Sequence, residues 1–231
     1  MFELIAGQSP YKSPTDMGVN MAGNCIVDDE ACREASRNEI IRRYFKALCD
    51  HKTGKNVDSE IFKLELLLNQ AGLAVGDRAV EKQAHAVAER TGGAPAAAIE
   101  LPDGRIVTGK TSGLMGACSA ALLNSLKTLA GIHDRVNLIA PMVLAPIQHL
   151  KVEHLGNSNP RLHTDEVLIA LSMSAVTNPT AEMAMEALSG LRGGEVHSSV
   201  ILSSVDENTF KKLGMHVTYE PVYQSHALYH K

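Results

Sequence analysis

The sequence predicts an α/β protein in which an amino-terminal helical subdomain, residues 1–92, precedes an α/β subdomain, residues 93–231. Apolar residues before Gly92-Gly93-Ala94-Pro95 recur with helical spacing, whereas those after it form short, strand-like runs. The chain ends in a strand–helix–strand pattern, the minimal crossover between parallel strands. We therefore expect three layers around a mixed sheet. The 231 residues, 45% of them hydrophobic, suffice to bury a core.

Three helices are expected in the first subdomain. Asp28 and Asp29 can cap a helix that ends between His51 and Gly54, because apolar residues recur along it every three or four positions. Asp58 is predicted to cap a second helix that stops at Gly72, and a third helix is predicted to start at Asp77.

A β-hairpin and a long helix are expected next. The stretches 96–101 and 105–108 flank Pro102-Asp103-Gly104, a turn signal in which Gly104 can take a positive φ. An uncharged stretch then predicts a helix over residues 114–130 with Gly131 as its stop.

The rest of the chain alternates predicted strands and helices. We expect a strand over residues 136–144, which prolines bracket, and helices over 163–175 and 179–188, which Thr164 and Asn178 would cap. A strand over 196–202, a helix that Asp206 caps, and a strand over 215–219 complete the pattern.

Composition excludes several classes of protein. A net charge of −4, no Trp and only nine Tyr and Phe residues argue against nucleic acid as a partner. The longest uncharged stretch, residues 111–126, is too short to span a bilayer, so no membrane partner is expected. Because the start MFELIAGQSP is not a signal peptide and none of the four cysteines forms CxxC, we expect reduced thiols in a cytoplasmic protein.

Residues 104–111 match the G-x-x-x-x-G-K-[ST] phosphate loop in letters. The inner residues are β-formers and Gly104 already serves the hairpin turn, so we interpret the match as coincidental. Lys110, Thr111 and Ser112, between a strand end and a helix start, are candidate anion ligands. Capping and solvation are the alternative explanation for these three residues.

The order of hairpin, long helix and strand is typical of cytidine-deaminase-like folds, in which a zinc ligand lies near the helix start. No glutamate follows Cys118 and no PCxxC occurs, so we predict a core thiol and no zinc site. His133, His149, His154 and His163 have no metal-binding spacing, and His149 and His154 would lie on opposite faces of a strand.

Three residues are candidates for proton transfer. His163 and Asp165 would lie at a helix mouth, and His197 on a buried strand. Helix capping alone is the alternative explanation for the first two, and a hydrogen-bonded core histidine is the alternative for the third. A separate polar loop over residues 11–23 is typical of ligand-contacting segments, although a plain loop is the alternative; its candidate binding residues are Lys12, Ser13, Thr15, Asp16 and Asn20.

Long strings of residues resemble a bacterial family known as domain of unknown function 1846, or uncharacterised protein family 0371. They include residues 11–23, 25–30, 39–44, 63–67, 101–106, 109–112, 159–166 and 195–199. The resemblance implies a helical subdomain followed by a three-layer α/β subdomain of deaminase-like topology, and it implies no activity. It covers the second half of the family's usual length, so we expect an amino-terminal α/β domain with a glycine-rich motif to be missing.

Two functional hypotheses follow. The first is an enzyme that binds a small anionic or phosphorylated metabolite at the interface with the missing domain, with no cofactor specified. The second is a non-catalytic assembly module in which the helical unit and the uncharged helix after Leu114 pair subunits of a homo-oligomer.

Overall fold

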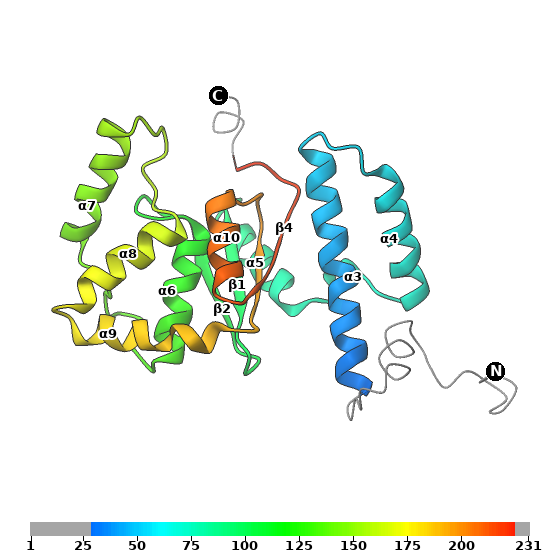
Figure 1. Ribbon diagram of the computed structural model, residues 1–231, viewed down its shortest axis with the longest axis horizontal. Helices are drawn as coiled ribbons and strands as arrows, with labels where there is room; N and C mark the ends of the chain where they lie inside the picture. The colour runs from blue at the N-terminus through cyan, green and yellow to red at the C-terminus, as the bar shows by residue number, and fades with distance from the viewer. Residues whose placement is uncertain (1–28, 225–231) are drawn as a thin grey trace, which may run out of the picture.

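A four-stranded mixed sheet with helices on both faces forms the centre of the protein (Figure 1). The computed structural model describes residues 29–224. The strands are β1 (Ala96–Glu100), β2 (Ile106–Lys110), β3 (Glu195–Ser198) and β4 (His216–Tyr219), in the order β2-β1-β3-β4. The α/β class is confirmed.

The predicted hairpin is confirmed. β1 pairs with β2 in antiparallel register from Ala96 opposite Lys110 to Glu100 opposite Ile106, and Gly104 has φ 82° in the turn between them. β1 also pairs antiparallel with β3, and β3 pairs parallel with β4. The crossover between these parallel strands is α10 (Ser204–Lys212), as the sequence predicts.

Successive residues of β1 face opposite sides of the sheet, as the strand pleat requires. Ala97 and Ile99 pack into the main core with helix α6 (Ala117–Leu129), whereas Ala98 packs against Val80 and Ala84 of α5 (Ala79–Arg90). His197 lies opposite Ala98 in the register and therefore shares the α5 face. The two faces thus have separate apolar clusters.

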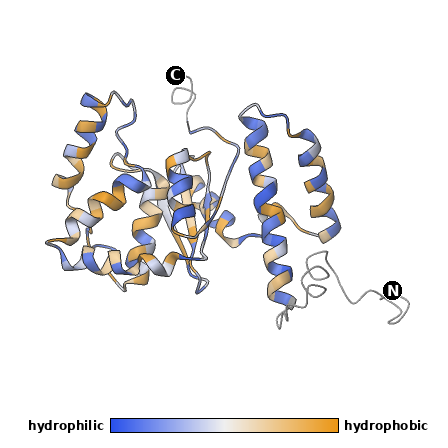
Figure 2. Cartoon of the chain, viewed as in Figure 1, coloured by the Kyte–Doolittle hydropathy of each residue, from blue (hydrophilic) through white to orange (hydrophobic). Residues whose placement is uncertain are grey.

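Two helices stand beside each other at one end of the molecule (Figure 1). They are α3 (Asp29–Lys52) and α4 (Asp58–Ala71), and a short 3₁₀ turn, η1 (Val75–Asp77), leads on to α5. Ile41 and Phe45 of α3 pack against Leu68 of α4. The visible face of α3 is largely hydrophilic in Figure 2, as expected for a helix that packs through one narrow apolar face.

An ion network attaches α3 to the sheet. Glu195 of β3 accepts hydrogen bonds from Arg42 of α3 at 2.5 Å and from Arg78, just before α5, at 2.6 Å. The Arg78 side chain is only 4% exposed, so its charge depends on Glu195 for compensation.

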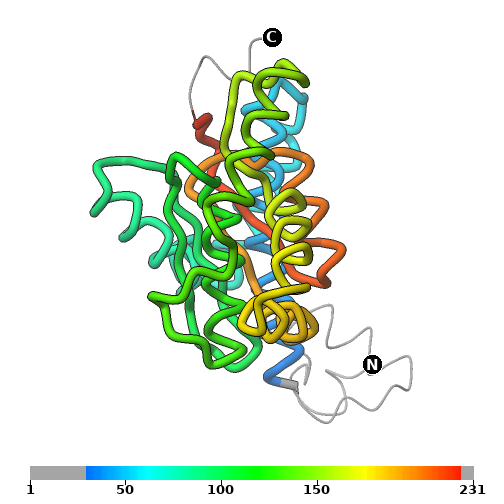
Figure 3. Tube along the Cα trace, turned by 90° about the vertical axis from the view of Figure 1, so that its left-hand side faces the viewer, coloured from blue at the N-terminus to red at the C-terminus, as the bar shows by residue number. Residues whose placement is uncertain are grey.

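Helices α7 (Pro141–His149), α8 (Thr164–Ala175) and α9 (Pro179–Glu186) follow one another down the opposite end of the molecule in Figure 1. The same order from top to bottom is visible in Figure 3, where this end faces the viewer. A π-helical turn, η2 (Leu150–His154), extends α7, and a 3₁₀ turn, η3 (Ala187–Leu191), extends α9. α8 is mostly hydrophobic in Figure 2, and its Val167, Ala170 and Leu171 lie in the main core.

The predicted strand over residues 136–144 is wrong. Pro141 begins α7 as its first helical residue, where its missing N–H costs nothing, and Pro146 lies inside the helix. His149 and His154 consequently do not alternate across a strand. Their ring centroids lie 5.5 Å apart, because residues five apart stack in a π-helical turn.

Several helix starts differ from the prediction by one to three residues. Val57 precedes α4 in place of the predicted cap Asp58, and Arg78 precedes α5 in place of Asp77. His163 precedes α8 in place of Thr164, and Ser203 precedes α10 in place of Asp206. Asn178 does cap α9, accepting a hydrogen bond from the Thr180 amide, and Gly72 ends α4 at φ 62°. Within residues 29–224, no helix is long and apolar enough to cross a membrane.

The apolar face of α6 is not free to pair subunits. Ala121, Leu122 and Leu126 are completely buried within the chain's own core. The prediction that this helix contributes to an oligomer interface is therefore wrong for the face that these residues form.

Candidate functional site

A cavity of about 250 Å³ lies where the amino ends of three helices meet. Gly116 to Ser119 at the start of α6, His163 before α8 and Ser203 before α10 all line it. Each helix amino end carries a partial positive charge and backbone N–H groups without intrahelical partners. The position therefore favours negative charge.

The start of α6 is the most unusual part of this cavity. Gly116, the residue before the helix, provides no side-chain cap, and the first turn contains no acidic residue. The first intrahelical donor is Ala120, which bonds to the Gly116 carbonyl. The amides of Ala117, Cys118 and Ser119 have no hydrogen-bond partner among the residues that the structure describes, although these three residues are at most 6% exposed. Three backbone donors in buried residues thus remain without a partner among the described residues.

Thr111 adds a fourth unused donor. Its hydroxyl oxygen is buried and has no hydrogen-bond partner among the described residues, and the residue lines the cavity. Thr111 follows β2 directly, so the strand fixes its position against the start of α6.

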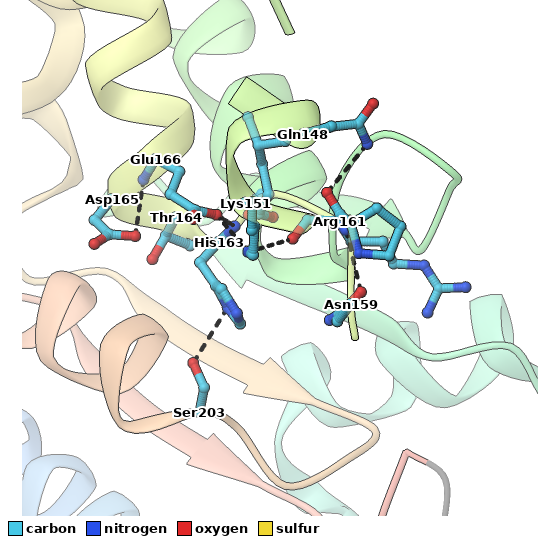
Figure 4. Close-up of polar contacts among 12 residues, drawn as sticks. Gln148, Lys151, Asn159, Arg161, His163, Thr164, Asp165, Glu166 and Ser203 are labelled. Carbon is cyan, nitrogen blue, oxygen red and sulfur yellow. Dashed lines mark hydrogen bonds and ion pairs between the residues drawn. The ribbon is translucent and has the colours of Figure 1, made fainter. Parts of the chain in front are cut away.

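His163 and Asp206 form the charged part of the site. Nδ1 of His163 lies 2.9 Å from Oδ2 of Asp206, whose other oxygen accepts from the Thr164 amide at 2.9 Å. The Ser203 hydroxyl donates to Asp206 at 2.8 Å and lies 3.3 Å from His163 Nδ1, the contact drawn in Figure 4. Because serine and aspartate meet the same imidazole nitrogen, the group does not have the relay geometry of a serine hydrolase, in which each nitrogen has one partner.

The pair fixes the charge of the imidazole. The hydrogen bond to Asp206 raises the pKa of His163 above its usual value, against the opposing effect of burial. Burial opposes ionisation of Asp206, but the hydrogen bond and charge of His163, together with bonds from Thr164 and Ser203, lower the pKa of this carboxyl. His163 is therefore held toward its cationic form beside the cavity.

A second polar cluster supports the loop that leads to His163 (Figure 4). Lys151, only 4% exposed, donates to the carbonyl of Arg161 at 2.8 Å and to Glu166 at 2.7 Å. Glu166 also accepts from the His163 amide at 2.7 Å, and Arg161 lines the cavity. These contacts hold the cavity wall in place.

The structure separates several residues that the sequence grouped. Asp165 is exposed, bonds to the amide of Glu166 and does not line the cavity, and His197 lies on the opposite face of the sheet. Lys110 is exposed at the end of β2, and Ser112 accepts from the amides of Leu114 and Met115 within its own turn. The loop candidates Lys12, Ser13, Thr15, Asp16 and Asn20 lie outside the described residues.

Other site residues were missed by sequence reasoning. The sequence predicts only a helix cap at Asp206 and only a core thiol at Cys118, yet both residues line the cavity. The missing cap of α6 has a sequence signal, because no Ser, Thr, Asp or Asn occurs between Gly113 and Ala117.

Within the described part of the chain, the side chains placed to share a metal ion are His85, His197 and Glu220.

A larger hollow, about 740 Å³, lies between α3, α4 and the hairpin turn. Its lining is predominantly acidic, with Glu30, Glu34, Asp77, Glu100 and Glu195 against Arg37 and Arg78. This charge disfavours an anion, so the smaller cavity is the better candidate site.

Fold and site together define a mixed α/β protein with a polar cavity at converging helix amino ends. The chain belongs to the family described as domain of unknown function DUF1846: the carboxy-terminal family model matches residues 76–229 and the amino-terminal model matches residues 1–72. The resemblance predicted from the sequence is confirmed.

Curated relatives carry the name UPF0371 protein. Those from Corynebacterium glutamicum strain R and Corynebacterium efficiens are each 55% identical over 231 residues, and one from Streptococcus pyogenes serotype M3 is 53% identical over 230 residues. Each match covers 100% of this chain and 46% of the relative. The chain therefore spans about half the length of these relatives, and the family is one of unknown function.

Proposed function

We propose that the cavity binds a small anionic, phosphate-bearing metabolite as part of an enzyme site. The observation that carries this proposal is the uncapped, buried start of α6, where three residues with unpaired amides line the cavity. Such a helix end satisfies its N–H groups with an anion in many phosphate sites. The Thr111 hydroxyl, the cationic His163 and Arg161 supply further donors on the same wall.

His163 is the best-placed group for proton transfer in this proposal. Its Nδ1 is held by Asp206, which leaves Nε2 as the nitrogen that could exchange a proton with a bound ligand. Lys110 adjoins Thr111 but does not line the cavity, so we keep it as a proposed outer ligand for the anion. The loop residues Lys12, Ser13, Thr15, Asp16 and Asn20 also remain proposed ligands. The rest of the site is proposed to come from an amino-terminal domain of the same protein.

Substitution of Gly116 tests the proposal, because an added Cβ meets nothing closer than the Leu162 carbonyl at 3.9 Å. Gly116→Asp places a capping carboxylate on the free amides, whereas Gly116→Ala leaves the amides open. Inorganic phosphate, ribose 5-phosphate and AMP serve as probes in thermal-shift titrations. A ligand at 100 times its Kd stabilises the folded state by about 2.7 kcal/mol.

We expect Gly116→Ala to keep the phosphate-induced rise in Tm and Gly116→Asp to abolish it. The aspartate variant itself should be about 1 kcal/mol more stable than the alanine variant, so lost binding cannot be attributed to unfolding. If none of the three probes raises the Tm of the unmodified chain, or if Gly116→Asp binds as well as Gly116→Ala, the proposal is wrong.

A second candidate function is that of an assembly module that forms a homo-oligomer. Phe62 and Leu66 favour it, because they lie one turn apart on the outer face of α4 and are 68% and 49% exposed. Large apolar side chains are rarely placed together on a free surface. The occupant that we propose is α4 of a second copy.

We also propose that the α/β part has the cytidine-deaminase-like topology and lies in the cytoplasm. The hairpin, the long helix α6 and the parallel β3–α10–β4 unit support the topology. Cys32, Cys49 and Cys118 form no disulfide among the described residues, which supports the compartment.

A further inference from the structure

Four ligand-type side chains meet on the α5 face of the sheet, away from the proposed anion cavity. His197 belongs to β3, Glu220 follows β4, and Glu81 and His85 lie one turn apart on α5. Nε2 of His197 lies 3.2 Å and Nε2 of His85 lies 3.0 Å from the same oxygen, Oε1 of Glu220. Oε1 of Glu81 is 4.0 Å from His85 Nε2.

The hydrogen bonds around His197 favour a proton on Nδ1 and leave Nε2 facing this group. Thr218 has one hydroxyl hydrogen and donates it to the Val196 carbonyl at 3.1 Å, while accepting from Arg78 at 2.6 Å. With that hydrogen committed, Nδ1 of His197, 3.0 Å from the same hydroxyl oxygen, is the nitrogen that carries the proton. When His197 carries this one proton only, its Nε2 and the Glu220 oxygen are both acceptors, and a cation between them would remove their repulsion.

Glu81 provides an independent observation. The residue is only 8% exposed, and its Oε2 has no hydrogen-bond partner among the described residues. A buried, unpaired carboxylate oxygen is costly unless something compensates it.

We propose that Glu81, His85, His197 and Glu220 form a binding site for a single divalent metal of the Zn²⁺ class. Two imidazole nitrogens and carboxylate oxygens are a donor set that suits such metals. Zn²⁺ bonds to nitrogen and oxygen of about 2.0–2.1 Å in tetrahedral geometry place neighbouring ligand atoms roughly 3.3 Å apart. The separations of 3.0 and 3.2 Å at Glu220 are close to that value.

The surroundings provide the support and the access that a metal site needs. Ligating histidines usually donate their second nitrogen to an outer partner, and Thr218 is that partner for His197. The His197 side chain is fully buried, whereas that of His85 is 47% exposed. A metal can therefore enter past His85 and reach His197.

Equilibrium dialysis of the metal-free 231-residue chain against ZnCl2 tests the site. We expect one Zn²⁺ per chain, with the affinity lowered at least about tenfold in both His85→Ala and Glu220→Gln. His149→Ala is the matched control, because His149 and His154 form a histidine pair outside the site. Its affinity should match that of the unmodified chain.

Thermal unfolding checks that the variants are folded and adds a second measurement. Zn²⁺ should raise the Tm of the unmodified chain and of His149→Ala, but not that of His85→Ala, whose half-exposed side chain can be removed without opening the core. If the unmodified chain binds no Zn²⁺ at micromolar concentrations, a proton and not a metal lies between His197 and Glu220, and the proposal is wrong. Equal binding by His85→Ala and the unmodified chain would also overturn it.

Discussion

His163 and Asp206 form an ion pair that leaves a cationic imidazole beside the cavity. Asp206 accepts from the His163 imidazole, the Thr164 amide and the Ser203 hydroxyl, so its negative charge is used within the protein. The neighbouring α6 amides keep their positive potential because no carboxylate caps them. The pair therefore contributes a cation to the cavity without neutralising the donors beside it.

Anion binding should weaken as the pH rises past the raised pKa of His163, because the imidazole then loses its charge. Sulfate is the appropriate probe, since its own charge does not change in this range. In Asp206→Asn, the interaction that raises the pKa is lost, so the midpoint of sulfate binding should move to lower pH. Calorimetric titrations between pH 5.5 and 9, with imidazole NMR of His163, would measure both quantities.

His149→Gln, outside the cavity, is the control for general pH effects and should leave the midpoint unchanged. The His163–Asp206 pair stabilises the folded protein over a limited range of pH. The stabilisation that comes from the raised pKa of His163 is lost as the pH rises through the pKa of His163 in the folded protein. The stabilisation that comes from the lowered pKa of Asp206 is lost as the pH falls through the pKa of Asp206 in the folded protein. A sulfate midpoint that is identical in Asp206→Asn would disprove the assigned role of the pair.

Sequence reasoning identified His163 and Thr111 as candidates but could not pair them with the right neighbours. Asp206 is 43 residues from His163, and only the packing of α10 beside α8 brings the two together. Asp165, adjacent in the sequence, points its carboxylate at its own helix amide instead. Sequence distance does not indicate spatial contact across a crossover, so the dyad was not predictable from one sequence.

At the scale of elements, the match to a phosphate loop has a packing explanation. Gly109, the second glycine of that match, lies in β2 against α6. A Cβ there would be 2.2 Å from the Ala121 nitrogen and 2.6 Å from the Ala117 oxygen. The glycine allows strand and helix backbones to approach each other, and that approach brings Thr111 to the start of α6.

Gly109→Ala should destabilise the protein by about 3 kcal/mol or more, because two backbones would have to separate. For a chain of this size the Tm should fall by roughly 6–12 °C. Gly113→Ala is the matched control, since nothing lies within 4 Å of its added Cβ and its φ is not positive. Thermal unfolding of both variants measures the difference. Equal Tm values would show that the close approach of β2 and α6 does not affect the free energy of unfolding.

Elements with clear end signals were predicted well, and the apolar run at residues 136–144 was not. Gly104 and Gly131 take the positive φ that a turn and a helix stop require, at 82° and 65°. In contrast, a short apolar run fits a buried strand and a buried helix equally, and Pro141 is compatible with a strand boundary or a first helical turn. Only tertiary packing decides between the two.

The molecule as a whole has one buried centre and one lightly attached end. α6 and α8 lie within the main core, whereas α4 packs against the described part of the chain chiefly through α3. Leu68 packs against α3, and Leu64, one turn earlier, is equally buried at 6% exposed. Phe62 and Leu66 lie on the opposite side of the helix and are exposed. The free energy available from covering this side is the physical basis of the proposed homo-oligomer.

Phe62→Glu combined with Leu66→Glu should convert the proposed dimer into a monomer. Two large apolar side chains at an isologous interface occur twice, once in each copy, so their loss should raise the dimer dissociation constant at least about tenfold. Light scattering across a concentration series measures this constant. Val176→Glu, at the far end of the molecule and 83% exposed, adds the same charge away from α4 and should leave the constant unchanged. A compact monomer at the highest concentration of the unmodified chain would exclude the assembly function and leave the anion site as the remaining candidate.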